Sequence, residues 1–540
     1  MSVRARSALL TGIALATGAL FALYLRQSRS VAVGSDGGSI ALQAWAMLHG
    51  NVLLHGWAMS DVSFYSTELP QYVLLERLRG LSPDVLHVGG AMTYAILVLL
   101  AALVAKGRAT GRDAVIRALI AAGIMLAPAA GDATSTLLLT PDHLGSAVPV
   151  LLAWLVIDRS GPRRYVPAAV GALLAWGMVA DRLIEVTGVI PLVAVCGIRA
   201  GQRVLQHRRD LGRTADIAAG EPLPSAARAP WWFEVSLAVA AVAAIGAADL
   251  VSAFIRASGG FTLRPVGTRF AGSAEIPHNV MLTAQGVLMM FGATFGRGQP
   301  VNLVFSSLHL TGVVLVAVAF GVALGRFFRR DELLVPALAL AIALNLLLYV
   351  HGRYAQDLLS TREITDVLPF GAVLAGRVLA GPVARARIHG KNVLMPALSA
   401  VLAGYAVTLV IYSDQPRVLA QNQDLAGWLV AHHLSDGLAA SYWLSDSVTA
   451  DSGGRAADRQ VSIRDGRLAA PDSGWGYDRY WYKPRSYRAD FVVTNAVAGT
   501  SAWHSLLNSA RLTFGPPARI YSYQQYTVLV WGKNLLTRLG

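Results

Sequence analysis

The feature that most constrains this chain is a succession of apolar segments, each long enough to cross a membrane. A transmembrane helix needs about 20 apolar residues, with about 17 to 25 as the usual range. The sequence predicts eleven such spans, the shorter of which need support from their neighbours: 8–26, 84–105, 114–131, 142–158, 165–180, 183–199, 232–255, 303–325, 333–350, 366–381 and 393–412. We therefore expect a polytopic α-helical membrane protein.

Composition agrees with this interpretation and removes several other classes. Hydrophobic residues make up 54% of the 540 residues and charged residues 14%, where soluble chains carry about a quarter charged residues. So apolar a chain is neither a string of soluble domains nor a disordered or coiled-coil protein. The lone cysteine, Cys196, lies in an apolar run and rules out a disulfide within one chain.

The net charge of +14 is explained by the placement of basic residues between the spans. Lys and Arg gather in cytoplasmic loops of membrane proteins because they resist translocation. If the N-terminus is cytoplasmic, every inner connection is basic: Lys106, Arg108 and Arg112; Arg159, Arg163 and Arg164; Arg199, Arg203, Arg208, Arg209 and Arg213; Arg326, Arg329 and Arg330; Arg385, Arg387 and Lys391. This pattern predicts a cytoplasmic N-terminus and leaves little reason to expect nucleic-acid binding.

Eleven crossings from an inner start place the C-terminal segment outside. Residues 1–412 form the predicted transmembrane domain, and residues 413–540 are too polar to span. Val, Phe and Trp in 490–494 and 527–531 indicate strands, and 424–434 indicates a short helix. We therefore expect a C-terminal extracytoplasmic domain of α/β or mostly β structure.

The outer loops are longer than simple connections require. The first, 27–83, holds two segments with helical spacing of apolar residues, 39–49 and 69–80, each too short to span. Helices of this kind lie along the membrane surface. A third apolar segment, 279–295, is bounded by charged residues and indicates a surface or re-entrant helix.

Asp36 follows the first span in the run Gly34-Ser-Asp36-Gly-Gly-Ser39, at the start of this long loop. An acidic residue at this place, in-plane helices, a polytopic bundle and an outer terminal domain together resemble the GT-C superfamily of membrane glycosyltransferases. Tail segments 437–443 and 514–517 look like those of actinobacterial members. The resemblance implies a polyprenyl-phosphate sugar donor. The chain departs from the protein mannosyltransferases, which have an Asp-Glu pair here instead of Asp-Gly-Gly.

Such chemistry requires a carboxylate to accept the proton of the attacking hydroxyl group. The resemblance places the base at Asp36, whose alternative role is to cap the helix 39–49. Asp61 is the rival, with Glu68 behind it; otherwise both are solvated loop carboxylates. The second outer loop offers Asp132, Asp142 and His143, which could hold a divalent cation (Mg²⁺, Mn²⁺ or Ca²⁺) or cap the following helix.

The phosphate leaving group needs a cation, and the outer face supplies several arginines. Arg362 is the first candidate because the forked guanidinium suits phosphate oxygens. Further candidate contacts to the substrate are Asp181, Arg182, Arg353 and Glu363, with Arg264, Arg269 and Arg297 as alternatives. The alternative for these residues is ion pairing among themselves, such as Asp181 with Arg182 or Arg362 with Glu363 or Asp366. Aromatic rings at Trp57, Tyr65, Trp475 and Trp481 could stack on sugars or build local cores.

The sequence thus predicts an integral membrane glycosyltransferase of a bacterial cytoplasmic membrane, with its site facing outward. The partners it implies are membrane lipids, a polyprenyl-phosphate-linked sugar donor, and a glycan, lipid or protein of the cell envelope as acceptor, with inverting transfer. Two other classes stay open: a transporter or flippase of lipid-linked glycans, and a non-catalytic scaffold of the envelope. A transporter places its polar residues in broken helices at mid-bilayer, whereas the candidate charges here lie in outer loops.

Overall fold

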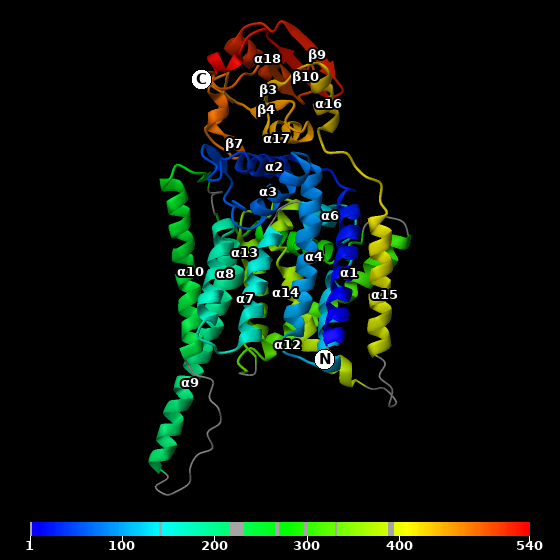
Figure 1. Ribbon diagram of the computed structural model, residues 1–540, viewed down its shortest axis with the longest axis vertical. Helices are drawn as coiled ribbons and strands as arrows, with labels where there is room; N and C mark the ends of the chain where they lie inside the picture. The colour runs from blue at the N-terminus through cyan, green and yellow to red at the C-terminus, as the bar shows by residue number, and fades with distance from the viewer. Residues whose placement is uncertain are drawn as a thin grey trace.

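A computed structural model describes residues 3–139, 143–216, 232–264, 269–295, 300–329, 332–386 and 394–539. A bundle of long, roughly parallel helices carries a smaller domain with a β-sheet at one end (Figure 1). Helices that lie across the bundle separate these two parts (Figure 1). The chain therefore has the predicted class of a polytopic helical membrane protein with a terminal α/β domain.

Helices lie at all eleven positions where spans were predicted. In order they are α1 (Val3–Ser28), α4 (Asp84–Lys106), α5 (Gly111–Met125), a bent stretch from α6 (Asp132–Thr134) and η1 (Ser135–Leu139) through η2 (His143–Ser146) to α7 (Ala147–Ser160), α8 (Val166–Ala180), η3 (Glu185–Val189) with α9 (Ile190–Asp216), α10 (Trp232–Ala257), α12 (Pro300–Gly325), α13 (Leu334–His351), η4 (Leu359–Ile364) with α14 (Val367–Arg385), and α15 (Leu394–Ser413).

The count of eleven spans is not confirmed. Among the described residues, eight helices are long and apolar enough to cross a membrane, or nine if the stretch bent by 46° near residue 140 is one span. The reason is length, since α5 and α8 have 15 residues each, fewer than the about 20 that a crossing needs. Helix α5 packs closely on α14, where a Cβ on Gly376 would be 2.6 Å from the Arg117 carbonyl oxygen.

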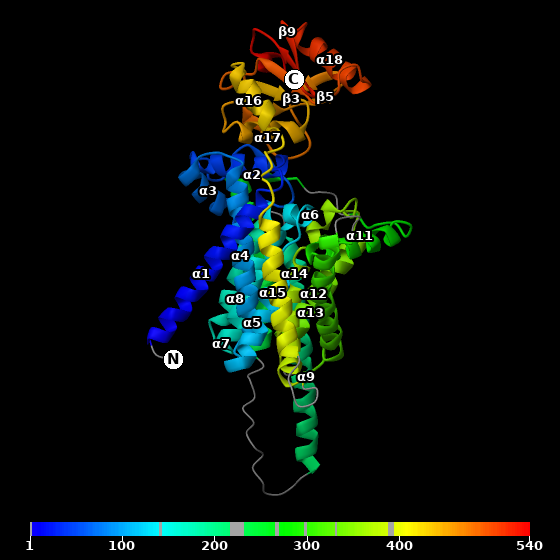
Figure 2. The same cartoon turned by 90° about the vertical axis from the view of Figure 1, so that its right-hand side faces the viewer.

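Two helices of the loop between α1 and α4 lie across the end of the bundle. They are α2 (Ser35–Leu48) and α3 (Glu68–Arg79), which confirms both helices predicted there (Figure 1). Helix α3 ends at Gly80, whose φ of +75° suits glycine. The predicted helix of the later loop is α11 (Ile276–Met290), which projects sideways from the bundle in Figure 2.

A three-stranded sheet joins three segments that are distant in sequence. Strand β1 (Trp57–Met59) lies between β2 (Thr262–Leu263), to which it is parallel, and β7 (Tyr477–Asp478), to which it is antiparallel. The loop between α1 and α4, the loop after α10 and the C-terminal domain are thereby joined to one another.

The C-terminal domain contains a mixed five-stranded sheet in the order β4-β3-β8-β10-β9. Its strands are β3 (Asp436–Ala439), β4 (Ala457–Gln460), β8 (Phe491–Thr494), β9 (Arg519–Tyr523) and β10 (Tyr526–Val530), and its helices are α16 (Gln423–Ala431), α17 (Tyr442–Asp451) and α18 (Ser501–Phe514). A hairpin of β5 (Ser462–Arg464) and β6 (Arg467–Ala469) and two short turns, η5 (Arg479–Tyr482) and η6 (Leu535–Arg538), complete it. The two predicted strands are β8 and β10, which pair with Val493 opposite Val528.

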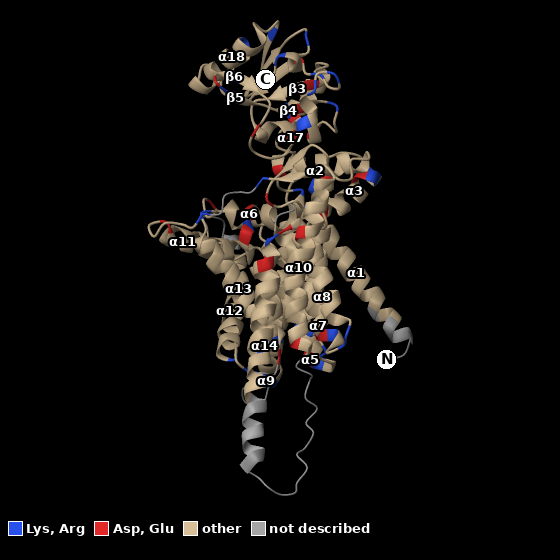
Figure 3. Cartoon of the chain, turned by 90° about the vertical axis from the view of Figure 1, so that its left-hand side faces the viewer, with Lys and Arg blue, Asp and Glu red and all other residues tan. Residues whose placement is uncertain are grey.

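The two ends of the bundle differ in their charged groups. Figure 3 shows acidic segments where the bundle meets the crossing helices, near α6. At the opposite end, Arg377 of α14 lies between Asp158, at 2.8 Å, and Glu332, and donates to the Val104 carbonyl oxygen at 2.9 Å. At this end the charged groups satisfy one another and hold the helix ends together. The acidic groups beneath the crossing helices are therefore the better candidates for a functional site.

Candidate functional site

Asp36 lies in the first turn of α2, at the junction between the bundle and the C-terminal domain. Gly34 is the N-cap residue of this helix, so Asp36 does not cap it, although its charge is favourable there. The Tyr442 hydroxyl donates to its Oδ1 at 2.7 Å, and the Arg362 guanidinium donates to its Oδ2 at 3.3 Å. The Asp36 side chain keeps 32% of its surface exposed. The carboxylate is thus oriented by two partners and open to solvent.

The short helix η4 carries two charged residues that reach different places. Arg362 contacts Asp36, whereas the next residue, Glu363, contacts His143 at 2.8 Å between Oε2 and Nε2. Asp357, just before the helix, stabilises its first turn, because its carboxylate accepts from the Ser360 amide at 2.9 Å. The helix is held to α13 by a hydrogen bond from the Asn345 side chain to the Glu363 carbonyl oxygen. η4 therefore links the Asp36 junction to a second polar group.

That second group, here called the acidic cluster, consists of Asp61, Glu68, His143, Asp181, Glu363 and Asp366. His143 is its centre, with Nδ1 2.8 Å from Asp181 and Nε2 2.8 Å from Glu363. A neutral imidazole can donate from one nitrogen only, so two carboxylate partners are both satisfied by the charged ring. Ser146, one turn from His143, donates to Asp366 at 3.3 Å. The cluster collects residues from four segments at one end of the bundle: the loop between α1 and α4, η2, the end of α8, and the segment of η4 and the start of α14.

The two members of the cluster from the loop between α1 and α4 have altered acidity. Burial, opposed by a hydrogen bond from Thr67 and helped by the nearby charge of Asp181, raises the pKa of Glu68 to about 7. Its carboxylate rests on Gly145, where a Cβ would lie 1.5 Å from Oε1. Desolvation and the charge of Glu363 raise the pKa of Asp61 as well. Both carboxyls hold a proton at higher pH than usual.

Other candidate residues lie apart from these two groups. Arg182 pairs with Asp249 and with Glu185, at 2.9 Å from the latter, rather than with Asp181 as expected. Arg353 pairs with Glu275 at 3.3 Å. Arg362 forms an ion pair with Asp36, one of the candidate bases. Arg297 lies outside the described residues.

The proposed cation ligands do not form a ligand set. Asp142 lies outside the described residues, Asp132 is exposed, and both ring nitrogens of His143 face carboxylates. Throughout the part of the chain that the structure describes, no group of three or more His, Cys, Asp or Glu side chains is arranged to hold a metal ion. Among the described residues, Asp132 and His143 therefore do not form the expected cation site.

The aromatic candidates divide between core and surface. Trp57 is 2% exposed and packs edge-to-face on Trp481, with ring centroids 5.1 Å apart. Tyr65 packs on Phe261 at 5.0 Å. Trp475 is 41% exposed and lies 6.4 Å from the ring of Tyr442. Trp475 is therefore the candidate ring that both faces solvent and lies beside the Asp36 junction.

Tyr442 and Asp366 are parts of this end that sequence reasoning missed as site residues. Tyr442 reaches Asp36 across 406 positions of sequence, and no spacing rule connects the two. Asp366 is fully buried at the start of α14, and it was the first residue of the predicted span 366–381. Its place after Arg362 and Glu363, in a densely charged segment at a span boundary, is the signal that could have marked it.

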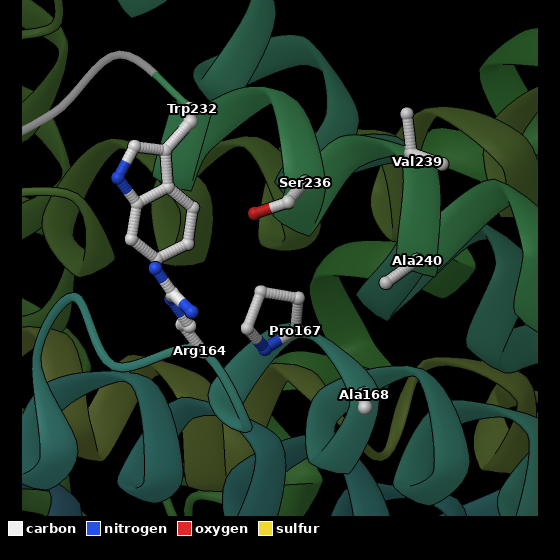
Figure 4. Close-up of a pocket in the computed structure, with 7 residues that line it drawn as sticks. All are labelled: Arg164, Pro167, Ala168, Trp232, Ser236, Val239 and Ala240. Carbon is white, nitrogen blue, oxygen red and sulfur yellow. The ribbon is translucent and has the colours of Figure 1, made fainter.

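A cavity of about 590 Å³ lies elsewhere, between α8 and α10 (Figure 4). It is lined by Arg164, Pro167, Ala168, Trp232, Ser236, Val239 and Ala240. Arg164 precedes α8 and Asp181 follows it, so 15 helical residues, or roughly 22 Å at 1.5 Å per residue, separate the cavity from the acidic cluster. This cavity is not part of the candidate site.

No protein-family model matches the sequence, and the search of curated proteins gave no match. Solved structures do resemble it. ArnT from Cupriavidus metallidurans bound to undecaprenyl phosphate is similar with a TM-score of 0.52 and 12% identity, over 98% of this chain and 98% of that chain. Its apo state gives 0.52 and 13%, over 99% of both chains. The chain has the fold of ArnT.

The archaeal oligosaccharyltransferase AglB from Archaeoglobus fulgidus, in complex with an inhibitory peptide and a dolichol-phosphate, gives a TM-score of 0.46 at 13% identity, over 94% of this chain and 72% of that one. The likeness to ArnT extends through the bundle, the crossing helices and the terminal domain, because it covers nearly the whole of both chains. The resemblance to GT-C enzymes predicted from the sequence is thereby confirmed for the fold.

Proposed function

We propose that this protein is an integral membrane glycosyltransferase that moves a sugar from a polyprenyl-phosphate donor to a hydroxyl group of a cell-envelope acceptor, with inversion at the anomeric carbon. The observation that carries the proposal is the contact of Asp36 with Arg362, 3.3 Å apart at an exposed junction. Such a reaction needs a base for the acceptor hydroxyl and a cation within reach of the leaving phosphate, and this junction holds both kinds of group. The fold shared with ArnT, a structure that holds undecaprenyl phosphate, supports the donor class.

The reaction assigns one task to each of these side chains. The acceptor oxygen attacks the anomeric carbon while its proton passes to the Asp36 carboxylate. The bond between that carbon and the donor phosphate oxygen breaks, and polyprenyl phosphate leaves with the electron pair. Arg362 stabilises the negative charge that develops on the phosphate. Since the acceptor enters opposite the leaving group, the anomeric configuration is inverted.

Arg362 can bind first the Asp36 carboxylate and then the donor phosphate. Its side chain is 43% exposed, so a donor phosphate that approaches from the membrane surface can reach it. The long contact to Asp36 is weaker than a short charge-assisted hydrogen bond, which has a length of about 2.7 to 2.9 Å. Phosphate therefore competes well for the guanidinium, and the Oδ2 atom of Asp36 becomes available to the acceptor hydroxyl.

The orientation of the protein in the membrane follows from the same proposal. We place the crossing helices and the C-terminal domain on the outer side of a bacterial cytoplasmic membrane and the N-terminus in the cytoplasm, as the basic connections predict. The lipid-linked donor then reaches the Asp36 junction from the outer leaflet, and the acceptor is a glycan, lipid or protein of the cell envelope.

The test uses the full chain in nanodiscs, incubated with radiolabelled polyprenyl-phosphate sugars and an envelope extract. Asp36→Asn keeps the shape of the side chain and removes the base, so we expect transfer to fall about 10²- to 10⁴-fold. Asp424→Asn, an exposed carboxylate on α16, is the matched control and should transfer normally. NMR of the product reports the anomeric configuration.

Three other results of this experiment would contradict parts of the proposal. Normal transfer by a folded Asp36→Asn variant would move the base to Asp61 or Glu68 in the acidic cluster. A product with retained configuration would contradict the inverting mechanism. Failure of the wild type with every donor would contradict a glycosyltransferase and favour transport of lipid-linked glycans or a scaffold role.

A further inference from the structure

We infer that the C-terminal domain completes the active site: the Tyr442 hydroxyl positions the Asp36 carboxylate, and the close contact of α17 with α2 at Gly38 holds it there. The inference rests on the proposed function, since it names a positioning residue for that site. It assigns to the domain a part in the transfer step itself, beyond any role in binding the acceptor.

The two helices touch at the level of their backbones. A Cβ on Gly38 would lie 2.8 Å from the Asp446 carbonyl oxygen and 3.0 Å from the Ser447 amide nitrogen, distances that the rigid backbone of α17 does not allow. Figure 1 shows α17 lying across α2. Ser35, one turn before Gly38, donates to Ser447 at 3.3 Å. The lack of a side chain at Gly38 therefore sets how closely the domain approaches Asp36.

Helix α17 is in turn fixed to the core of its own domain. Asn422, just before α16, donates to the Ser447 hydroxyl at 2.5 Å and accepts from the Tyr526 hydroxyl of β10 at 2.8 Å. Gly476, with a φ of +81°, lies against the ring of Tyr442, where a Cβ would be 2.5 Å from Cε2. The position of the Tyr442 ring is thus determined by the sheet and by a tight turn, and not by the bundle.

The two oxygens of Asp36 have different partners, and this gives the tyrosine its role. Arg362 holds Oδ2 from the bundle, and Tyr442 holds Oδ1 from the domain. Once the donor phosphate draws the guanidinium away, the tyrosine alone keeps the carboxylate aimed at the acceptor. Burial and the charge of Asp36 hold the pKa of Tyr442 well above its usual range, so its hydroxyl remains a donor to this carboxylate.

The decisive variant is Tyr442→Phe, which keeps the ring and removes the hydroxyl. We expect kcat to fall roughly ten- to hundredfold, as the loss of a hydrogen bond to a charged group implies, with KM for the donor nearly unchanged. The matched control is Tyr482→Phe in the same domain, which loses a part-buried hydrogen bond of 2.6 Å to the Gln460 carbonyl oxygen but does not contact Asp36. A purely structural role predicts equal effects in both variants.

A second pair of variants tests the docking. Gly38→Ala must push α17 away, so we expect a loss in kcat similar to that of Tyr442→Phe in a protein that still folds. Gly427→Ala on α16, where a Cβ would meet no atom within 4 Å, should leave transfer unchanged. Melting temperatures of all variants are measured in parallel.

The outcomes separate the two proposals. A wild type inactive with every donor overturns the proposed function and this inference with it. An active wild type whose Tyr442→Phe variant keeps its kcat, or loses no more than Tyr482→Phe, overturns the inference alone. A rise in KM at constant kcat overturns it too, because the tyrosine would then bind substrate and not position the base.

Discussion

Glu76 on α3 provides a sharp test of the electrostatics of the crossing helices. Its side chain is 1% exposed on the buried face of the helix, and neither carboxyl oxygen has a hydrogen-bond partner among the described residues. Burial therefore raises the pKa of Glu76 from its ordinary value of 4.5 to about 9. The folded protein holds this proton through neutral pH, whereas the unfolded chain releases it.

The sign and size of the effect follow from this difference. Since the folded state binds more protons between pH 4.5 and 9, the contribution of Glu76 to stability is most favourable below pH 4.5 and is lost as the pH rises toward 9. The loss is about 1.4 kcal/mol for each pH unit, or about 3.4 kcal/mol between pH 4.5 and pH 7. Glu76→Gln cannot titrate and escapes this loss.

The assay compares melting temperatures of wild type, Glu76→Gln and the exposed control Asp424→Asn from pH 4.5 to pH 8 in one detergent. The melting temperature of Glu76→Gln should rise steadily relative to that of the wild type as the pH rises, whatever the difference between them at pH 4.5. The control should follow the wild type throughout. A constant difference between Glu76→Gln and wild type across this range would refute the reasoning, because it would mean that Glu76 does not change its charge on folding.

Three further variants follow from the described contacts. Arg362→Lys keeps the charge but loses the forked donors, so we expect a higher KM for the donor in kinetic titrations, and an unchanged KM would argue against phosphate binding at this residue. His143→Gln leaves Asp181 and Glu363 without their shared cation, and we expect a loss of about 3 to 5 kcal/mol in stability, seen as a large drop in melting temperature. Gly90→Ala would place a Cβ 2.2 Å from the Leu138 carbonyl oxygen and should cost about 1 to 3 kcal/mol, while Gly246→Ala, with open space around it, should not destabilise the protein.

Periodicity and length in the sequence were enough to predict the helical class and the place of each long helix. They were not enough to predict the number of spans, because α5 and α8 are short helices whose burial depends on their neighbours. Helix α2 begins at Ser35, four residues earlier than predicted, and its added turn includes Gly37 and Gly38, a residue type that is unfavourable inside a helix. Gly38 lets the backbone of α17 approach, and Gly37 lies against Val33 and Leu86, so the role of both glycines depends on tertiary packing.

The C-terminal sheet was predicted in part for a similar reason. Strands β8 and β10 carry the Val and Phe residues that favour strands, and both were predicted. Strands β3, with the sequence Asp-Gly-Leu-Ala, and β4, with Ala-Asp-Arg-Gln, carry almost none and owe their conformation to parallel pairing.

Of the candidate site, Asp36 and Arg362 were named separately from the sequence, but their contact was not foreseen. The acidic cluster joins residues from four segments, and charge patterns along a chain do not show which segments meet. Whether these residues perform the proposed roles stays a prediction, as does the boundary between the domains at residue 412.

The three-stranded sheet sets the order in which this protein can be completed during synthesis. Strand β1 must wait for β2, which begins about 200 positions after β1, and for β7, which begins about 420 positions after β1. At about 5 to 20 residues per second, roughly 20 to 80 seconds pass between the synthesis of β1 and that of its last partner. Tyr442 and α17 belong to the same late segment. The long helices of the nascent chain are therefore made before the three-stranded sheet is complete. The surroundings of Asp36 are assembled only after all these helices have been made.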